Sequence, residues 1–219
     1  MQIINDSFGN VLTISTCKNT EYYTNDDIQT AINAIFNLPE IKNRIKGQHW
    51  DAQYGEGETS EIVPYLKVEN LSGTKDLIEW IKTECLLALP NFYECKSNNI
   101  VIDRSWMNKL DYGTQGRCHR HLGIDYGDTD DTNGLGITPD LVGIFYVNAP
   151  DDSSDLIIIK DGEHRKLHDE FPEEQKYYLR PKTGELVLHQ PDIWHAVGKH
   201  NNKDPRICFV FHISYTYNI

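Results

Sequence analysis

Three side chains that commonly bind metal ions lie close together in the segment GRCHRHLGID, at positions 116–125. They are His119, His121 and Asp125. Residues two apart on a β-strand project to the same face, so His119 and His121 can share one ion without distortion of the backbone. A polar surface loop can carry the same residues with no chemical role. The pair therefore predicts a metal site only if a further ligand comes from elsewhere in the chain.

The segment ELVLHQPDIWHAVGKH offers three more candidate ligands: His189, His195 and His200. His195 is the best placed, because it follows a predicted strand and a proline turn, and an apolar alternation resumes at Val197. Imidazole and carboxylate ligands suit iron, whereas thiolates favour zinc or iron–sulfur clusters. Cys118 is therefore expected to pack on the opposite face of its strand and not to bind the metal.

Arg206 begins the otherwise apolar run RICFVFHIS, eleven residues after His195. A strand of this composition would bury the guanidinium, and a buried guanidinium needs an anion, usually a carboxylate bound through two N–H groups. Arg206 alone could equally form a salt bridge at the edge of a sheet. What favours a site is the order: a His-x-His pair, a distal histidine, and then an arginine on the next strand.

The elements that must position these residues change in type along the chain. Helices are predicted over residues 24–36, opened by a capping box of Thr24 with Asp27, and over residues 74–89, opened by Thr74. From residue 98 onward, β-branched and aromatic runs alternate with turn residues: NIVIDRSWMNKL, LVGIFYVN, DLIIIK, KYYLR, ELVLH and RICFVFHISYTY. Helices followed by strands predict an α+β fold with an antiparallel sheet system.

The segment from Trp106 to Ile213 resembles the Fe(II)- and 2-oxoglutarate-dependent dioxygenases, in particular the prolyl-hydroxylase-like branch with its phage and marine-bacterial relatives. The matching stretches are WMNKLDYGTQGRCHRH, LVGIFYVNAP, YLRPKTGELVLHQPDIWHAV and DPRICFVFHIS, and they cover about half of the chain. The resemblance implies a double-stranded β-helix (jelly-roll, cupin-like) core. It implies a single dioxygenase domain over residues 1–219, with 1–95 as a helical support region and 96–219 as the core.

The resemblance also implies roles for individual residues. His119 and His195 match the iron-binding histidines, and Arg206 matches the residue that grips the distal carboxylate of 2-oxoglutarate. Tyr146 and, with a weaker alignment, Tyr112 match positions that donate hydrogen bonds to this cosubstrate. The cofactors implied are Fe(II) and 2-oxoglutarate, and the reaction is a hydroxylation coupled to decarboxylation of 2-oxoglutarate. Around this site, packing roles are expected for Trp106, Trp194 and Val197.

The chain departs from the family at the middle ligand. Most members have Asp where this sequence has His121, although His-x-His occurs in the phage-like branch. Three neutral imidazoles would leave iron(II) with a charge of +2, whereas a carboxylate would leave +1. His121 is the first choice for this ligand. Asp125 is the alternative, because a bend after His121 could bring its carboxylate to the metal.

Two other functions remain open at this point. A cupin-type dioxygenase with three histidines would bind its substrate on the iron and need no 2-oxoglutarate. A non-catalytic jelly-roll binding module would carry the histidines without a chemical role.

Composition limits the partners and the location. The formal net charge of −12 disfavours a nucleic acid as partner, and a small molecule or peptide of unknown identity is the expected substrate. The odd number of cysteines, five, favours a reducing compartment, and neither a secretory signal nor a membrane span is visible. We therefore expect a cytoplasmic protein, and the phage-like resemblance includes a virus-encoded one. The acidic, glycine-containing loop at 127–140 is either a substrate gate or a solvated insertion.

Overall fold

The computed structural model describes residues 1–17, 22–42, 58–60, 66–94, 97, 99–122 and 138–216. Asp125 and residues 127–137 of the candidate gate loop lie outside the described residues.

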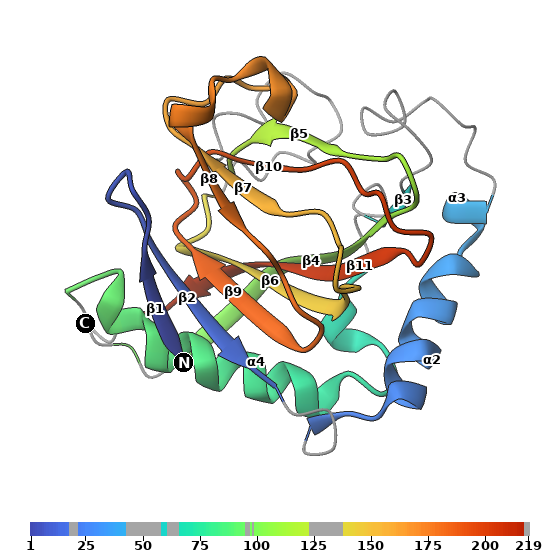
Figure 1. The fold of residues 1–219 in the computed structure, drawn as a ribbon. Helices are drawn as coiled ribbons and strands as arrows, with labels where there is room; N and C mark the ends of the chain where they lie inside the picture. Colours follow the sequence, from blue (N-terminus) through green and yellow to red (C-terminus); the bar gives the residue numbers. More distant parts are fainter. Residues whose placement is uncertain are drawn as a thin grey trace.

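Two antiparallel sheets face each other and form the centre of the described structure (Figure 1). The larger sheet has the strand order β1 (Gln2–Asn5), β2 (Val11–Thr16), β9 (Glu185–His189), β6 (Leu141–Asn148), β11 (Arg206–Tyr215), β4 (Ile100–Leu110) and β3 (Glu58–Thr59). The smaller sheet has the order β5 (Gly116–His119), β10 (His195–Val197), β7 (Leu156–Ile159) and β8 (Lys176–Leu179). Each sheet therefore combines strands that are distant in the sequence.

Helices cover the outer face of the larger sheet (Figure 1). They are α2 (Asn25–Phe36) and α4 (Lys75–Ala88). The short α3 (Pro39–Lys42) follows α2, and the 3-10 turns η2 (Val68–Asn70) and η3 (Leu89–Asn91) flank α4. Two further 3-10 turns, η6 (His168–Glu170) and η7 (Glu173–Gln175), lie between β7 and β8 of the smaller sheet. The capping box of Thr24 and Asp27 is present, because each side chain receives the backbone N–H of the other residue. No helix within the described ranges has both the length and the apolar character needed to cross a membrane.

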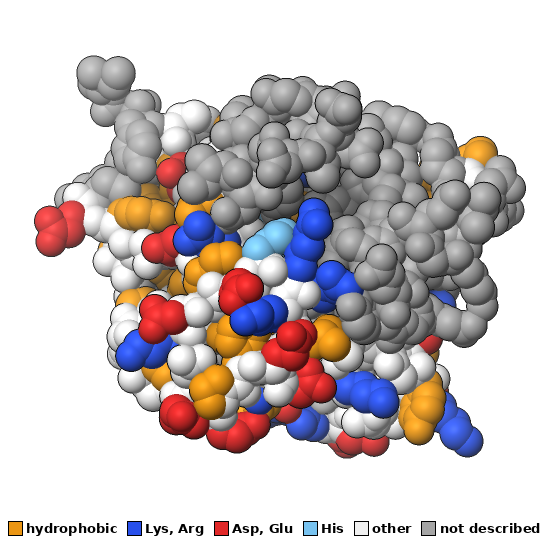
Figure 2. Space-filling view, turned by 90° about the horizontal axis from the view of Figure 1, so that it is seen from above, with side chains coloured by type: hydrophobic (Ala, Val, Ile, Leu, Met, Phe, Trp, Pro, Cys, Tyr) orange, Lys and Arg blue, Asp and Glu red, His pale blue; other side chains and the backbone are white. Residues whose placement is uncertain are grey.

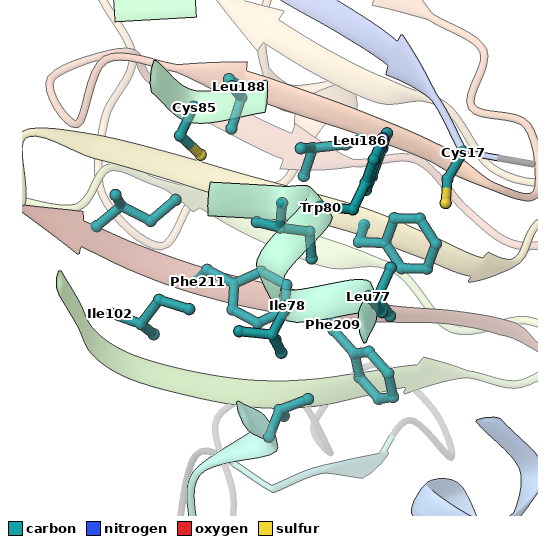
Figure 3. Packing of buried hydrophobic residues seen from close by; sticks show 14 of the residues in the cluster. Cys17, Leu77, Ile78, Trp80, Cys85, Ile102, Leu186, Leu188, Phe209 and Phe211 are labelled. Atoms are coloured by element: carbon teal, nitrogen blue, oxygen red, sulfur yellow. The ribbon is translucent and has the colours of Figure 1, made fainter. Parts of the chain in front are cut away.

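Strand β11 separates the two hydrophobic cores of the molecule. Its odd-numbered residues from Ile207 to Ile213 pack with α2 and α4 in the outer core, where Phe209 and Phe211 lie beneath α4 (Figure 3). Its even-numbered residues point the other way, into the layer between the sheets: Arg206, Cys208, Val210 and His212. The strand is buried on both faces, and its polar side chains are confined to the inner one.

Most elements expected from the sequence are present in the structure. Both helices and all six predicted strands form, and every strand pairing is antiparallel. The region expected as helical support also contributes strands to the larger sheet: residues 1–17 form β1 and β2 beyond β9, and Glu58–Thr59 form β3 beside β4. Thr74 does not cap α4 through its side chain, since its hydroxyl donates to the carbonyls of Val68 and Leu71 instead.

Two leucines of α4 provide a matched test of this packing. Leu77 is fully buried in the outer core, whereas Leu87 is 58% exposed on the same helix. We expect Leu77→Ala to lower the free energy of unfolding by about 2–5 kcal/mol, because it leaves a cavity between helix and sheet. Leu87→Ala should change it by less than about 0.5 kcal/mol. Urea denaturation followed by circular dichroism measures both, and equal losses would contradict the assigned orientation of α4.

Candidate metal centre

The pairing of β10 with β5 brings two distant histidines together. His195 lies directly opposite His119 in the register of this antiparallel pair, and the centroids of the two rings are 4.4 Å apart. Directly opposed residues on adjacent strands have side chains on the same face. Segments separated by more than seventy residues in the sequence thus supply one cluster.

His121 completes the cluster from just beyond the end of β5. Its backbone N–H donates to the carbonyl of Pro191 at 2.8 Å, which ties the segment after β5 to the turn before β10. The His121 ring is 5.1 Å from both the His119 and the His195 rings. One ligand nitrogen from each of the three residues lies within 4.8 Å of those of the other two. The His-x-His spacing therefore brings both rings to one place, although only His119 belongs to the strand.

Hydrogen bonds to the backbone set which nitrogen of each ring faces the cluster. The Nδ1 atoms of His119 and His195 lie 2.8 Å and 3.0 Å from the carbonyl oxygens of Arg117 and Ile193, each two residues earlier. A carbonyl only accepts, so each Nδ1 carries the proton and each neutral ring keeps its lone pair on Nε2. This is the form of histidine that binds a metal ion.

Two further histidines enter the same interior from the larger sheet. His212 on β11 and His189 on β9 are both paired with Val142 of β6, so their side chains share the inner face of the sheet. The His212 Nε2 atom lies 2.8 Å from His121 Nδ1, and the His189 ring is 4.8 Å from the His195 ring. His189 Nδ1 donates to the Gln190 carbonyl at 2.7 Å, whereas its Nε2 atom is buried and has no hydrogen-bond partner among the described residues.

Burial keeps all of these rings neutral. Desolvation lowers the pKa of His119, and it holds the pKa values of His121 and His195 well below the ordinary value. It lowers the pKa of His189 to about 4 and that of His212 to about 3. Neighbouring imidazoles add to the shift, since protonation of one ring disfavours protonation of the next. The cluster therefore offers lone pairs to a cation at neutral pH.

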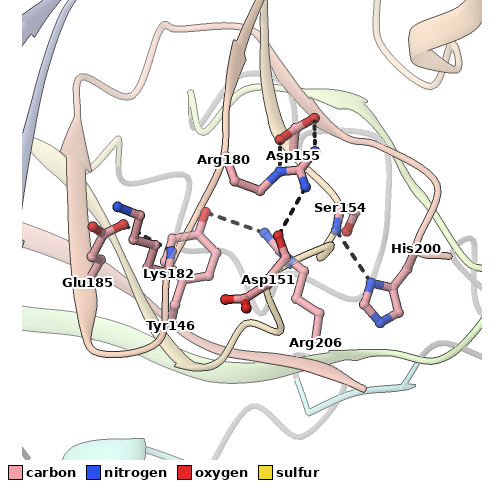
Figure 4. Close-up of polar contacts among 9 residues, drawn as sticks. All are labelled: Tyr146, Asp151, Ser154, Asp155, Arg180, Lys182, Glu185, His200 and Arg206. Carbon is pink, nitrogen blue, oxygen red and sulfur yellow. Dashed lines mark hydrogen bonds and ion pairs between the residues drawn. The ribbon is translucent and has the colours of Figure 1, made fainter. Parts of the chain in front are cut away.

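Arg206 is buried in the same layer without an acidic partner. Its side chain is 1% exposed, and it forms no ion pair with a carboxylate of the described residues. One terminal nitrogen, Nη2, lies 3.4 Å from the Tyr146 hydroxyl oxygen (Figure 4). The other, Nη1, lies 3.8 Å from the Cys208 sulfur. The Nε donor is buried and unsatisfied. A buried charge left in this state costs several kcal/mol unless an anion neutralises it.

Tyr146 adds a second donor beside Arg206. It is fully buried, and the Arg206 guanidinium carbon lies 4.9 Å from the centre of its ring. Burial raises the pKa of the Tyr146 phenol, so the hydroxyl stays protonated. Because Arg206 donates to the phenol oxygen, the hydroxyl hydrogen can point to another acceptor. Together, the two side chains suit a carboxylate.

The remaining candidates from the sequence fall outside this arrangement. Tyr112 lies in the turn after β4 with 66% of its surface exposed, a position that gives its cosubstrate role no support. His200 is a structural histidine, because its Nε2 atom bonds the Asp204 carbonyl and its Nδ1 accepts from the Ser154 amide. Cys118 is buried as expected, and burial raises the pKa of its thiol to about 12.

Of the two tryptophans expected around the site, Trp106 packs beside the histidines, whereas Trp194 packs with Cys118 on the face of the smaller sheet that points away from them. Trp106 is buried between the sheets, with its ring 5.0 Å from that of His212. Trp194 packs partly buried against the small cluster that includes Cys118, and the Arg120 guanidinium stacks over it at 4.5 Å. Seen from above in Figure 2, a histidine reaches the described surface next to lysine or arginine side chains. His119 is the least buried of the three clustered histidines.

Sequence reasoning missed His212, and it named His189 as a candidate ligand but preferred His195. The signal for His212 was available, because it lies six residues after Arg206 on one strand and therefore on the same face. His189 required the register of β9 with β6, which no local pattern specifies.

The residues present fit a resident metal ion and an anionic cosubstrate. The donor set consists of three neutral imidazoles, which suits iron, copper, nickel or zinc and not magnesium or calcium. Two orphaned polar atoms, Arg206 Nε and His189 Nε2, line the same interior and need partners that the described protein atoms do not supply.

Comparisons with known proteins agree with this chemistry. A sequence-family profile described as "Putative 2OG-Fe(II) oxygenase" (2OG, 2-oxoglutarate) matches residues 138–212, about a third of the chain. The matched segment contains Tyr146, His195 and Arg206 and excludes the His-x-His pair. No curated protein sequence matches the chain.

Solved structures share the fold at low sequence identity. The alpha ketoglutarate dependent carbocyclase SnoK from nogalamycin biosynthesis has a TM-score of 0.58 at 12% identity, over 92% of this chain and 78% of that chain. A Pseudomonas putida prolyl-4-hydroxylase has a TM-score of 0.53 at 11% identity, over 94% and 93%. HygX from Streptomyces hygroscopicus, with nickel and 2-oxoglutarate bound, has a TM-score of 0.53 at 10% identity, over 94% and 83%. Identities of this size show a common fold and no more.

The family match confirms the resemblance that the sequence motifs indicate. Together with the histidine cluster, it indicates an Fe(II)- and 2-oxoglutarate-dependent oxygenase, and hence an oxidoreductase.

The buried histidines predict how the stability of the metal-free protein depends on pH. Between pH 6.5 and about 4, His189 is protonated in the unfolded chain and neutral in the folded one. Stability is therefore lost as the pH falls, by about 1.4 kcal/mol per pH unit for each such histidine. Urea denaturation in a chelator from pH 7 to pH 5 should show this slope, and His189→Leu should reduce it. A wild-type stability that stays constant over this range would contradict the neutral cluster.

Proposed function

We propose that this protein is an Fe(II)- and 2-oxoglutarate-dependent hydroxylase in which His119, His121 and His195 bind the iron. Arg206 and Tyr146 bind the distal carboxylate of 2-oxoglutarate. One observation carries the proposal. Three imidazole lone pairs converge in one interior, and the buried Arg206 guanidinium there has no carboxylate partner among the described residues.

The protein's own contribution is positioning. Iron(II) held in this way supplies dioxygen activation coupled to decarboxylation of the cosubstrate. The three imidazoles would hold the iron, and a chelating 2-oxo acid would bind beside them. Arg206 and Tyr146 fix the far end of that acid, so its 2-oxo carboxylate is presented to the metal in one orientation. The apolar residues of the inner core, Val142, Ile144 and Leu156 among them, exclude water from this layer.

The charges of the site favour this cosubstrate. Three neutral imidazoles leave the bound metal at +2, and Arg206 adds another positive charge in the same interior. A dicarboxylate with an oxo group next to one carboxylate can place one negative charge at each of them, which leaves a net charge of about +1. A monoanion would satisfy only one of them, which favours 2-oxoglutarate over a simple carboxylic acid.

The proposal extends to the architecture and the setting. The two facing sheets serve as a double-stranded β-helix core, and residues 1–219 act as a single domain. The substrate is a small molecule or a peptide, and the enzyme acts in the cytoplasm.

The three-histidine set also supports a second candidate, a cupin-type dioxygenase that binds its substrate on the iron without 2-oxoglutarate. Arg206 distinguishes the two candidates, because only the first gives its charge a function. If Arg206→Met left oxygen consumption intact without added 2-oxo acid, the second candidate would be favoured.

Replacing Arg206 tests the cosubstrate site directly. Arg206→Met should weaken 2-oxoglutarate binding by about 2–5 kcal/mol, or roughly 30- to 4000-fold in Kd, while metal binding persists. Arg180→Met is the matched control, because Arg180 is paired with Asp155 at the surface. The measurements are anaerobic titration of the Fe(II)–2-oxoglutarate absorption band and succinate formation in air. Wild-type protein with neither the band nor succinate would sink the proposal.

The same Arg206 variant should not lose stability in the absence of ligand. Removing an unpaired buried charge relieves its desolvation cost, so the Tm of ligand-free Arg206→Met should equal or exceed that of the wild type. Only the wild type should gain Tm on addition of 2-oxoglutarate, because ligand binding stabilises the folded state alone. A large loss of Tm in the ligand-free variant would show that Arg206 serves the fold.

Substitution of the middle ligand decides between His121 and Asp125. His121→Ala should abolish tight binding of nickel(II), a stable substitute for iron(II), whereas Asp125→Asn should leave the Kd within about threefold. Isothermal titration calorimetry gives both values. The reverse result would assign the ligand to the carboxylate.

A further inference from the structure

The link between His121 and His212 goes beyond the ligand set itself. His121 Nδ1 and His212 Nε2 are 2.8 Å apart, and the two side chains are 2% and 3% exposed. The rings meet nearly edge to face, with an interplanar angle of 88°. They come from segments about ninety residues apart in the sequence, so the contact depends on the docking of the two sheets.

We infer that His212 is a positioning residue that accepts the Nδ1–H of His121 and so directs the His121 Nε2 lone pair to the metal. This inference rests on the proposed function. A hydrogen bond between two neutral imidazoles requires one donor and one acceptor. A metal on His121 Nε2 takes the lone pair there, which places the proton on Nδ1. The 2.8 Å bond then runs from His121 to His212.

The other two ligands obtain the same orientation from the backbone. His119 and His195 each donate Nδ1–H to a carbonyl two residues earlier in their own segment. His121 lies after the end of β5 and uses a side chain of the opposite sheet for this purpose. The acceptor that orients His121 can therefore be removed by substitution, whereas the backbone carbonyls that orient His119 and His195 cannot.

The surroundings of His212 support the role of acceptor. Its ring packs edge to face on Trp106 at 5.0 Å, which limits its rotation. Its directly opposed neighbour on β4 is the cationic Arg104, which disfavours a second positive charge on the buried His212 ring. A neutral ring keeps one lone pair, and the proposal places it on Nε2, facing His121.

This arrangement explains how a histidine can occupy the middle ligand position. A carboxylate needs no tautomer to be selected, because both of its oxygens accept. An imidazole binds only in the correct tautomer, so it needs a partner that holds the proton on the other nitrogen. His212 also places the ligand support on β11, the strand that carries Arg206.

His212→Phe tests the inference by removing the acceptor while keeping a ring against Trp106. Loss of such a partner typically weakens metal binding by roughly 10- to 100-fold, and we expect the nickel(II) Kd to rise by this factor. His212→Gln should restore most of the affinity, because its amide oxygen can reach the position of Nε2. His212→Asn is one methylene shorter and should not, which keeps the test decisive if the Phe variant fails to fold.

Val210→Ala is the control for a merely structural effect. Val210 lies two residues away on the same face of β11, and its truncation lowers stability without touching His121. Its nickel(II) Kd should stay within about threefold of the wild type. Calorimetric titration and Tm are measured for all variants.

The outcomes separate this inference from the proposed function. A His212→Phe Kd within threefold of a tightly binding wild type overturns the inference and leaves the proposed function intact. Equal losses in the Gln and Asn variants, or a loss in Val210→Ala as large as in His212→Phe, also overturn it. A wild type that binds no nickel(II) overturns both.

Discussion

The register of β10 against β5 is the constraint on which the site depends. It sets His195 directly opposite His119, so strand pairing alone brings the two imidazoles together. β10 pairs with β7 on its other edge, where His195 meets Ile158, and the short strand is thus held from both sides. A shift of one residue would turn the His195 side chain to the other face and destroy the cluster. The precision of the metal centre therefore comes from sheet pairing and not from the histidines themselves.

Burial then decides the chemical state of what the register brings together. In water these imidazoles would be partly protonated near neutral pH and would repel one another. Between the sheets, desolvation keeps them neutral, and carbonyl acceptors place the proton on the nitrogen that faces away from the cluster. The same burial gives the Arg206 charge a high desolvation free energy, because no carboxylate of the described chain neutralises it. One physical cause thus prepares a cation site and an anion site in a single interior.

The sequence predicted the parts of this structure that are governed by local periodicity. The amino-acid sequence itself shows the apolar stripe of α4, the nearly continuous apolar run of β11 and the capping box that begins at Thr24. Arg206 stood out because a charge interrupts an apolar strand, and its burial is confirmed. The two strands β1 and β2 were missed because both are short and β1 is a mostly exposed edge strand. Their place in the sheet depends on the pairing of β2 with β9.

The site was predictable only as far as a spacing implies a shared face. His119 and His195 followed from motif order, but the support of His121 by His212 did not, because it joins residues of different sheets. His189 lies in an apolar strand, where a histidine in the sequence looks like any packed residue. Its orphaned nitrogen becomes visible only when the neighbouring strand and its hydrogen bonds are known.

The proposed assignment also implies that metal and cosubstrate binding assist each other. A divalent cation on three neutral ligands and a buried guanidinium repel through an interior that screens charge poorly. A dicarboxylate that bridges them turns this repulsion into two attractions, so either ligand should raise the affinity for the other by the same factor. A carboxylate at the position of His121 would reduce the metal charge by one and weaken this coupling. The histidine at position 121 therefore lowers the affinity for the metal alone and makes metal binding depend more strongly on the anion held by Arg206.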